Sequence, residues 1–183
     1  MEKPPSVCSH QYLFHALLNT GDEIIDSILE NGLRPLSDFP DSARWQQINA
    51  EMPGFFENLY EMIAQPVLKK PYINAGVFVS PIDFRLLPES IMFDKTRVRI
   101  PVARIDPAYA CLTYVLDDER ISLPFSPENL RRAAEIWTAE MVTEWFAKDR
   151  SKIFFYVPQL AVYQPGGIRV EPADIERFGP QPI

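Results

Sequence analysis

Glycine is scarce in this sequence, and its scarcity argues against several kinds of nucleotide site. The 183 residues include only 7 glycines, and these form no G-x-G-x-x-G pattern and no Walker phosphate loop. Both motifs depend on glycine because the backbone must approach the phosphates closely. A dinucleotide site of the Rossmann type is therefore disfavoured.

Local motifs of hydrolases and metalloenzymes are missing as well. The chain has no G-x-S-x-G and no H-E-x-x-H pattern, which mark a serine nucleophile and a zinc-binding helix. A Ser-His-Asp triad assembled from distant residues stays open as an alternative, although no local feature supports it. The two histidines, His10 and His15, would point to opposite faces of one strand because their spacing is odd. We therefore predict no metal site.

Cysteine, positive charge and long apolar runs are also in short supply. The only cysteines are Cys8 and Cys111, without a C-x-x-C pair, so we expect free thiols in a reducing cytoplasm. The net charge of −7 disfavours broad binding to nucleic-acid phosphates as the function. No run approaches the roughly 18 apolar residues of a membrane span, and MEKPPSVCSH lacks the apolar core of a secretion signal. We expect a cytoplasmic protein without membrane partners.

Proline, by contrast, is abundant. The 18 prolines favour many short elements with stiff connections over a helical bundle, and the length fits one domain, residues 1–183. The order of strand-like and helical patterns predicts an α+β fold with a mainly antiparallel sheet. Helices are expected at 22–31, in an insertion at about 40–65 broken at Pro53-Gly54, and as one long helix at about 127–147. Strands are expected at 11–16, 76–81, 97–105, 109–116, 152–157 and 159–163.

The expected strand RVRIPVARI makes two further predictions. Alternation of its side chains places Arg97 and Arg99 on the outward face. Pro101 has no N–H to donate to a neighbouring strand, which suggests an edge position.

Four short segments, in this order along the chain, resemble segments of ADP-ribosyltransferase-like domains. In that family a hydrophobic–His pair on the first strand is followed by a helix that ends in E-x-GL-x-P. The resemblance covers about half of the chain, and the shared order of the segments carries it. The segments are Leu13-Phe14-His15, Ile28–Pro35, Gly76–Ser80, and Pro158–Tyr163 followed by Ile168 and Glu171–Ile175.

The resemblance implies a split, mainly antiparallel sheet that clamps NAD, the substrate, in an extended cleft. Family members take one catalytic residue from each of three strands, and the matching positions here are His15, then Phe78 or Ser80, then Gln159. In these roles His15 would donate to the ribose hydroxyls of NAD. Phe78 would stack on nicotinamide, or Ser80 would orient it by hydrogen bonding. Gln159 would lie beside the ribose carbon at which positive charge develops.

Two positions depart from the family pattern. Many family members have a glutamate where this chain has Gln159, and a carboxamide cannot supply the negative charge that stabilises an oxocarbenium-like transition state. Glu171 is the carboxylate that would serve in its place. Ala16 follows His15 where the family often has a Gly-Thr pair, which bears on the contacts to the nicotinamide amide.

Two functions of different classes follow from these observations. The first is an NAD-binding ADP-ribosyltransferase-like enzyme that releases nicotinamide. The second is a non-catalytic interaction module that keeps the scaffold and binds a protein partner through its acidic surface and the aromatic segment 42–65. An RNA 2′-phosphotransferase is disfavoured because an RNA substrate calls for basic residues that this chain lacks in bulk.

Overall fold

The fold is α+β, as the sequence predicts. The computed structural model describes residues 6–17, 21–86, 96–148 and 156–177. Within these ranges it contains six α-helices and seven strands, and all strand pairs are antiparallel. The strands form two sheets, one of three strands and one of four.

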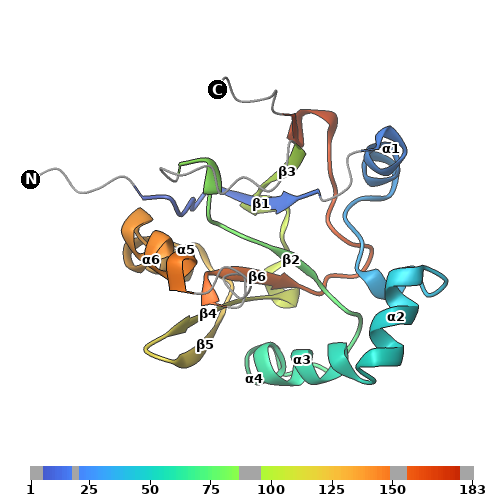
Figure 1. Cartoon of the computed structure of the whole chain (residues 1–183), viewed down its shortest axis with the longest axis horizontal. Coiled ribbons are helices and arrows are strands. Elements are labelled where there is room, and N and C mark those ends of the chain that lie inside the picture. The colour runs from blue at the N-terminus through green and yellow to red at the C-terminus, as the bar shows by residue number, and fades with distance from the viewer. Residues whose placement is uncertain (1–5, 18–20, 87–95, 149–155, 178–183) are drawn as a thin grey trace, which may run out of the picture.

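The three-stranded sheet joins segments from the beginning, middle and end of the chain (Figure 1). Its central strand β3 pairs with both neighbours, so that Leu13 lies opposite Ile100 and Val98 lies opposite Ile175. Leu13, Val98 and Ile100 are fully buried. The strands, in spatial order, are β1 (Tyr12–Ala16), β3 (Thr96–Pro101) and β7 (Ile175–Arg177).

The four-stranded sheet places a late strand between two earlier ones. Strand β6 pairs on one side with β2 and on the other with β4, and β4 forms a hairpin with β5. The hairpin turn consists of Asp117 and Asp118, both with positive φ, as expected for a two-residue turn between twisted strands. The strands, in spatial order, are β2 (Val77–Val79), β6 (Gln159–Val162), β4 (Ala110–Leu116) and β5 (Glu119–Pro124).

In the described part of the chain, an isolated β-bridge joins the two sheets. The backbone N–H of Phe14 donates to the carbonyl of Ser80 at 2.7 Å, and the N–H of Ser80 donates to the carbonyl of Phe14 at 2.9 Å. Strand β1 therefore lies next to the end of β2, and the two sheets together form one split sheet.

The helices lie on different sides of the sheets (Figure 1). Helices α3 and α4 cover one face of the four-stranded sheet, where Tyr60 and Ile63 pack with Cys111, Ala161 and Tyr163. The larger core lies on the other side and includes residues of α5 and α6. The helices are α1 (Asp22–Asn31), α2 (Ala43–Glu51), α3 (Phe55–Ile63), α4 (Gln65–Leu68), α5 (Pro127–Ile136) and α6 (Ala139–Lys148).

The expected long helix at 127–147 is wrong, because the structure divides it in two. Trp137 ends α5 with a non-helical backbone (φ −88°, ψ 82°) and is fully buried. The hydroxyl of Thr138 then accepts from the backbone N–H of Met141 at 3.3 Å, as a helix-capping side chain does. The buried indole of Trp137 therefore lies at the break between the two helices. The expected strand at 152–157 lies mostly outside the described residues.

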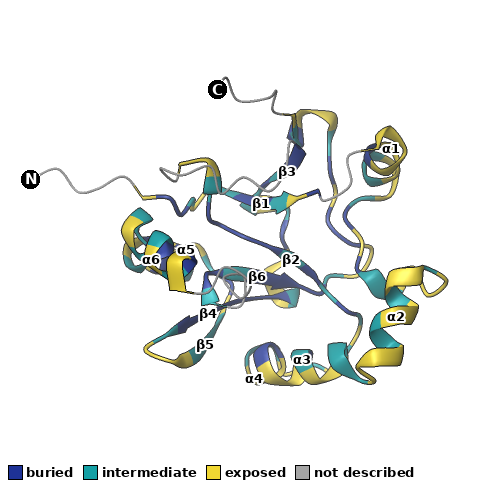
Figure 2. Ribbon diagram, viewed as in Figure 1, coloured by how far each residue is buried: buried dark blue, intermediate teal, exposed yellow. Residues whose placement is uncertain are grey.

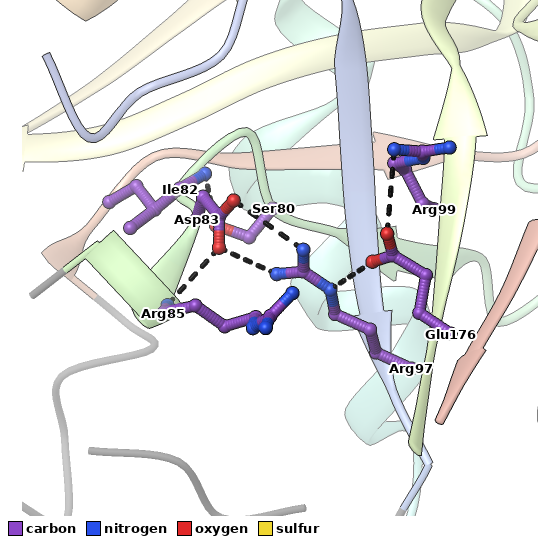
Figure 3. A network of polar contacts seen from close by, with 7 residues as sticks. All are labelled: Ser80, Ile82, Asp83, Arg85, Arg97, Arg99 and Glu176. Carbon is purple, nitrogen blue, oxygen red and sulfur yellow. Dashed lines mark hydrogen bonds and ion pairs between the residues drawn. The ribbon is translucent and has the colours of Figure 1, made fainter. Parts of the chain in front are cut away.

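Arg97 is buried, although alternation places it on an outward face. Its guanidinium donates to Asp83 Oδ1 and to Glu176 Oε2, each at 2.6 Å, and its Cζ lies 4.2 Å from the centre of the Phe14 ring. Figure 3 shows this guanidinium between the two carboxylates, while Glu176 also contacts Arg99. Asp83 follows β2 and Glu176 belongs to β7, so the network links the end of one sheet to the other. Sequence alternation could not show these distant carboxylates.

Candidate functional site

The residues that the sequence marks as a site come from three neighbouring strands. His15 lies on β1, Phe78 on β2 and Gln159 on β6, and β2 adjoins both of the others. Each of the three side chains is partly exposed (Figure 2 shows the burial of these strands). Phe78 comes 63 residues after His15 and 81 residues before Gln159. The split sheet therefore brings three segments that are distant in sequence next to one another.

His15 is held by the backbone of the adjoining strand. Its Nδ1 lies 2.9 Å from the carbonyl oxygen of Phe78. Because a carbonyl only accepts, Nδ1 carries the proton, and Nε2 of the neutral ring is a hydrogen-bond acceptor. The sequence suggests that His15 donates to a ribose hydroxyl, but this geometry reverses the direction: Nε2 would accept from that hydroxyl.

Burial lowers the pKa of His15 below its usual value of 6.5, and the hydrogen bond to Phe78 raises it only in part. The unfolded chain therefore binds this proton more readily than the folded one. The contribution to stability is present above pH 6.5 and is lost as the pH falls toward the folded-state pKa.

We expect the imidazole of His15 to titrate below pH 6.5 in an NMR titration of the His10→Ala protein, in which it is the only histidine. The free energy of unfolding should also fall below that pH, and the slope should flatten in His15→Ala. A titration midpoint at or above 6.5 would contradict the buried, Nδ1-bonded geometry.

Phe78 and Ser80 differ in their burial and in their hydrogen bonds. Phe78 pairs with Ala161 and contacts the small core under α3 and α4, with part of its ring exposed. Ser80 is buried, and its hydroxyl donates to the carbonyl of Pro158 at 3.0 Å while accepting from the N–H of Ile82 at 3.2 Å. The hydroxyl of Ser80 thus joins β2 to the start of β6, which leaves Phe78 as the second-strand residue with a free surface.

Gln159 begins β6 and faces the same side of the sheet as Phe78. It lies opposite Thr113 of β4, and Ala161, two positions later, lies opposite Phe78. Within the described residues its carboxamide makes no hydrogen bond. An amide at this place can donate and accept, but it carries no charge.

Comparison with protein-family models, curated proteins and solved structures found no match. The function of the chain must therefore be argued from its own residues.

Glu171 does not replace the missing carboxylate at Gln159. Its carboxylate lies 3.1 Å from Arg104 and 3.1 Å from Arg169. It precedes the short 3-10 turn Pro172–Asp174, and it lines a separate cavity of about 710 Å³ beside the end of α1. Another cavity, of about 580 Å³, lies between the N-terminal segment, β1 and α5. Neither of these two cavities is lined by His15, Phe78 or Gln159. The Phe14–Ser80 bridge and the alternation of side chains place His15 on the opposite face of the strands from Phe78 and Gln159.

Metal chemistry finds no support in the part of the chain that the structure describes. There, no group of three or more His, Cys, Asp or Glu side chains is arranged to hold an ion. Both cysteines are buried free thiols, and burial raises the pKa of each to about 12. No helix among the described residues is long and apolar enough to cross a bilayer.

A polar row that was not predicted lies beside Gln159. Thr113, its partner on β4, accepts from the guanidinium of Arg120 at 3.0 Å and lies 3.3 Å from the hydroxyl of Ser122. Arg120 and Ser122 belong to β5, a strand that was not expected. The alternation in ERISLP after the acidic turn at 117–118 is the signal that would have revealed it.

Proposed function

We propose that this chain is an ADP-ribosyltransferase-like domain that binds NAD at the surface formed by β1, β2 and β6. The observation that carries the proposal is that the strands of His15, Phe78 and Gln159, which are distant in sequence, adjoin one another in a split antiparallel sheet. The resemblance implies a site built from three such strands.

Each residue has a role that its geometry allows. His15, fixed by Phe78 through Nδ1, presents Nε2 to a ribose hydroxyl. The exposed part of the Phe78 ring offers a surface on which the nicotinamide ring can stack. The carboxamide of Gln159 would lie beside C1′ of the nicotinamide ribose and hydrogen-bond a ribose hydroxyl.

The proposed reaction breaks the bond between C1′ and the nicotinamide nitrogen. The electron pair of that bond leaves with nicotinamide, which becomes neutral, and C1′ acquires oxocarbenium character. A nucleophile of the acceptor then forms a bond to C1′ and releases its proton, if it carries one, to solvent. Because Gln159 is uncharged, it would stabilise this transition state less than a glutamate at the same position would.

Calorimetry with NAD tests the proposal directly. Wild-type protein should bind NAD, and His15→Asn should weaken binding about 5–10-fold, the value of one hydrogen bond. The asparagine amide retains a donor for the Phe78 carbonyl but has no acceptor in the place of Nε2. His10→Ala, which changes an exposed residue outside the three strands, is the matched control and should bind as wild type does. Absence of NAD binding at millimolar concentration would refute the proposal.

One observation favours the interaction module as a second candidate. Helix α2 contains no buried residue, and Phe39, Met52 and Met62 on the same insertion are between 45% and 56% exposed. Trp45 stacks on Phe56, Phe55 contacts Phe56 edge to face, and all three are only half buried. If NAD does not bind, this insertion is the surface on which a protein partner should be sought.

A further inference from the structure

The cavity of about 580 Å³ between the N-terminal segment, β1 and α5 plays no part in the proposed function, because none of the residues proposed to contact NAD lines it. Its volume lies within the range of about 300–1,000 Å³ that is typical of small-molecule sites. Part of its lining is a buried apolar wall, whose side chains are each at most 9% exposed. This wall consists of Val7, Cys8, Phe14 and Ala134.

Hydrogen bonds hold the N-terminal side of this cavity in place. The N–H of Ser9 donates to the carbonyl of Pro81 at 2.7 Å, which fixes the segment beside the end of β2. The hydroxyl of Ser6 lies 3.1 Å from the carbonyl oxygen of Ala134, which fixes the same segment to α5. Binding at this cavity would therefore cost little ordering of the chain, which favours affinity for a small ligand.

An arginine with spare hydrogen-bond donors lines the same cavity. The side chain of Arg99 on β3 is 40% exposed, and its Cζ lies 4.7 Å from the centre of the Tyr12 ring. Among the described residues, its guanidinium makes an ion pair with Glu176, from Nη1 to Oε1 at 3.4 Å, and no hydrogen bond (Figure 3). The shorter contact of Glu176, at 2.6 Å, is to Arg97. Because a guanidinium has five N–H donors in a planar fork, Arg99 can still bind both oxygens of a carboxylate.

The charges around the cavity favour a ligand with a single negative charge. Asp83 and Glu135 also line the cavity, and Glu176 lies next to it through its contact with Arg99. Three arginines balance these three carboxylates. They are Arg97, Arg99 and Arg131. A phosphate monoester carries about −1.5 to −2 charges at pH 7, so the three carboxylates would repel it more strongly than they would a carboxylate ligand.

We propose that this cavity binds a small monocarboxylate with an apolar tail. The carboxylate of the ligand accepts hydrogen bonds from Arg99, and its tail packs against the buried apolar wall. This site goes beyond the proposed function, since it needs neither NAD nor the residues proposed to contact NAD.

An NMR titration with octanoate tests the location of the site. Octanoate, added to about 5 mM so that weak binding is detected, should shift the amide signals of Cys8, Tyr12 and Ala134. The signals of Phe78 and Gln159 should stay in place. No shift at the three cavity residues in wild type would overturn the proposal, whatever the result with NAD.

A variant of Arg99 tests the recognition of the carboxylate. Arg99→Gln should weaken octanoate binding about 10-fold, the loss of a charge-assisted hydrogen bond. Arg34→Gln is the matched control, because the Arg34 side chain is 36% exposed, is paired with Asp38 and lies outside this cavity. It should bind octanoate as wild type does. Equal affinities of wild type and Arg99→Gln would show that Arg99 does not bind the carboxylate and would overturn the proposal.

A series of ligands tests the chemistry of the tail and of the charge. From butyrate through hexanoate to octanoate, each added methylene should tighten binding up to about 4-fold as it becomes buried. Octyl phosphate should bind more weakly than octanoate. Affinity that does not depend on chain length, or tighter binding of octyl phosphate, would contradict an apolar monocarboxylate as the ligand.

Discussion

Replacing Arg97 with alanine is expected to lower the free energy of unfolding by about 3–5 kcal/mol, the typical cost of removing one partner from a buried ion pair. The side chain of Arg97 is 10% exposed and those of Asp83 and Glu176 are each 19% exposed. Without the guanidinium, two carboxylates would face each other with little solvent. Urea denaturation with linear extrapolation measures the change.

Arg132→Ala is a matched control for this prediction. Arg132 contacts Glu128 at 2.6 Å, the same distance as the Arg97 contacts, but both side chains are more than 60% exposed. Solvent screening limits such a helical pair to about 0.3–0.5 kcal/mol. If both variants lost the same small amount, burial of the Arg97 network would not matter, and its role in joining the two sheets would have to be abandoned.

Replacing Gln159 with glutamate is expected to raise the rate of nicotinamide release from NAD about 100-fold, the effect of one well-placed electrostatic group. The two side chains have nearly the same shape, so in the proposed complex the change would add a negative charge beside C1′ and little else. The gain should disappear at acidic pH as the new carboxyl group becomes protonated, near its usual pKa of about 4.3. Fluorescent or chromatographic detection of nicotinamide measures the rate.

Gln46→Glu adds the same charge on the exposed surface of α2 and should leave the rate unchanged. A rate in Gln159→Glu that equals or falls below the wild-type rate would show that Gln159 does not lie beside the reacting carbon. NAD affinity, measured in parallel, separates a loss of binding from a loss of chemistry.

Elements with strong local signals were predictable from the sequence. Helix α1 has the expected bounds, and Gly32 just after it has a φ of +78° and approaches the backbone of Ile168 so closely that a Cβ would lie 2.6 Å from its oxygen. The insertion likewise forms helices on both sides of Pro53-Gly54. These features depend on residues near one another in sequence.

Features set by distant contacts were less predictable. Strand β7 was missed because it has only three residues, and β5 was missed because no residue of it is fully buried, although its alternating pattern was a signal; pairing with β3 and β4 defines the two strands. Pro101 has no N–H to donate, which suggested that its strand lies at the edge of a sheet, but β3 is the central strand. The proline lies beyond Val98, where pairing with β7 ends, so its missing N–H breaks no ladder. The position of Arg120 beside Gln159 has the same origin, since it follows from a strand order that sequence alone does not give.

The insertion of β6 between β2 and β4 has a consequence for the newly made chain. During translation, β2 and the β4–β5 hairpin leave the ribosome well before β6, and the two do not pair with each other. Until residue 162 has emerged, each keeps an unpaired edge with exposed backbone N–H and C=O groups, the kind of edge that pairs with other chains. A chaperone that shields these edges during synthesis should therefore increase the yield of native protein more than one supplied after release.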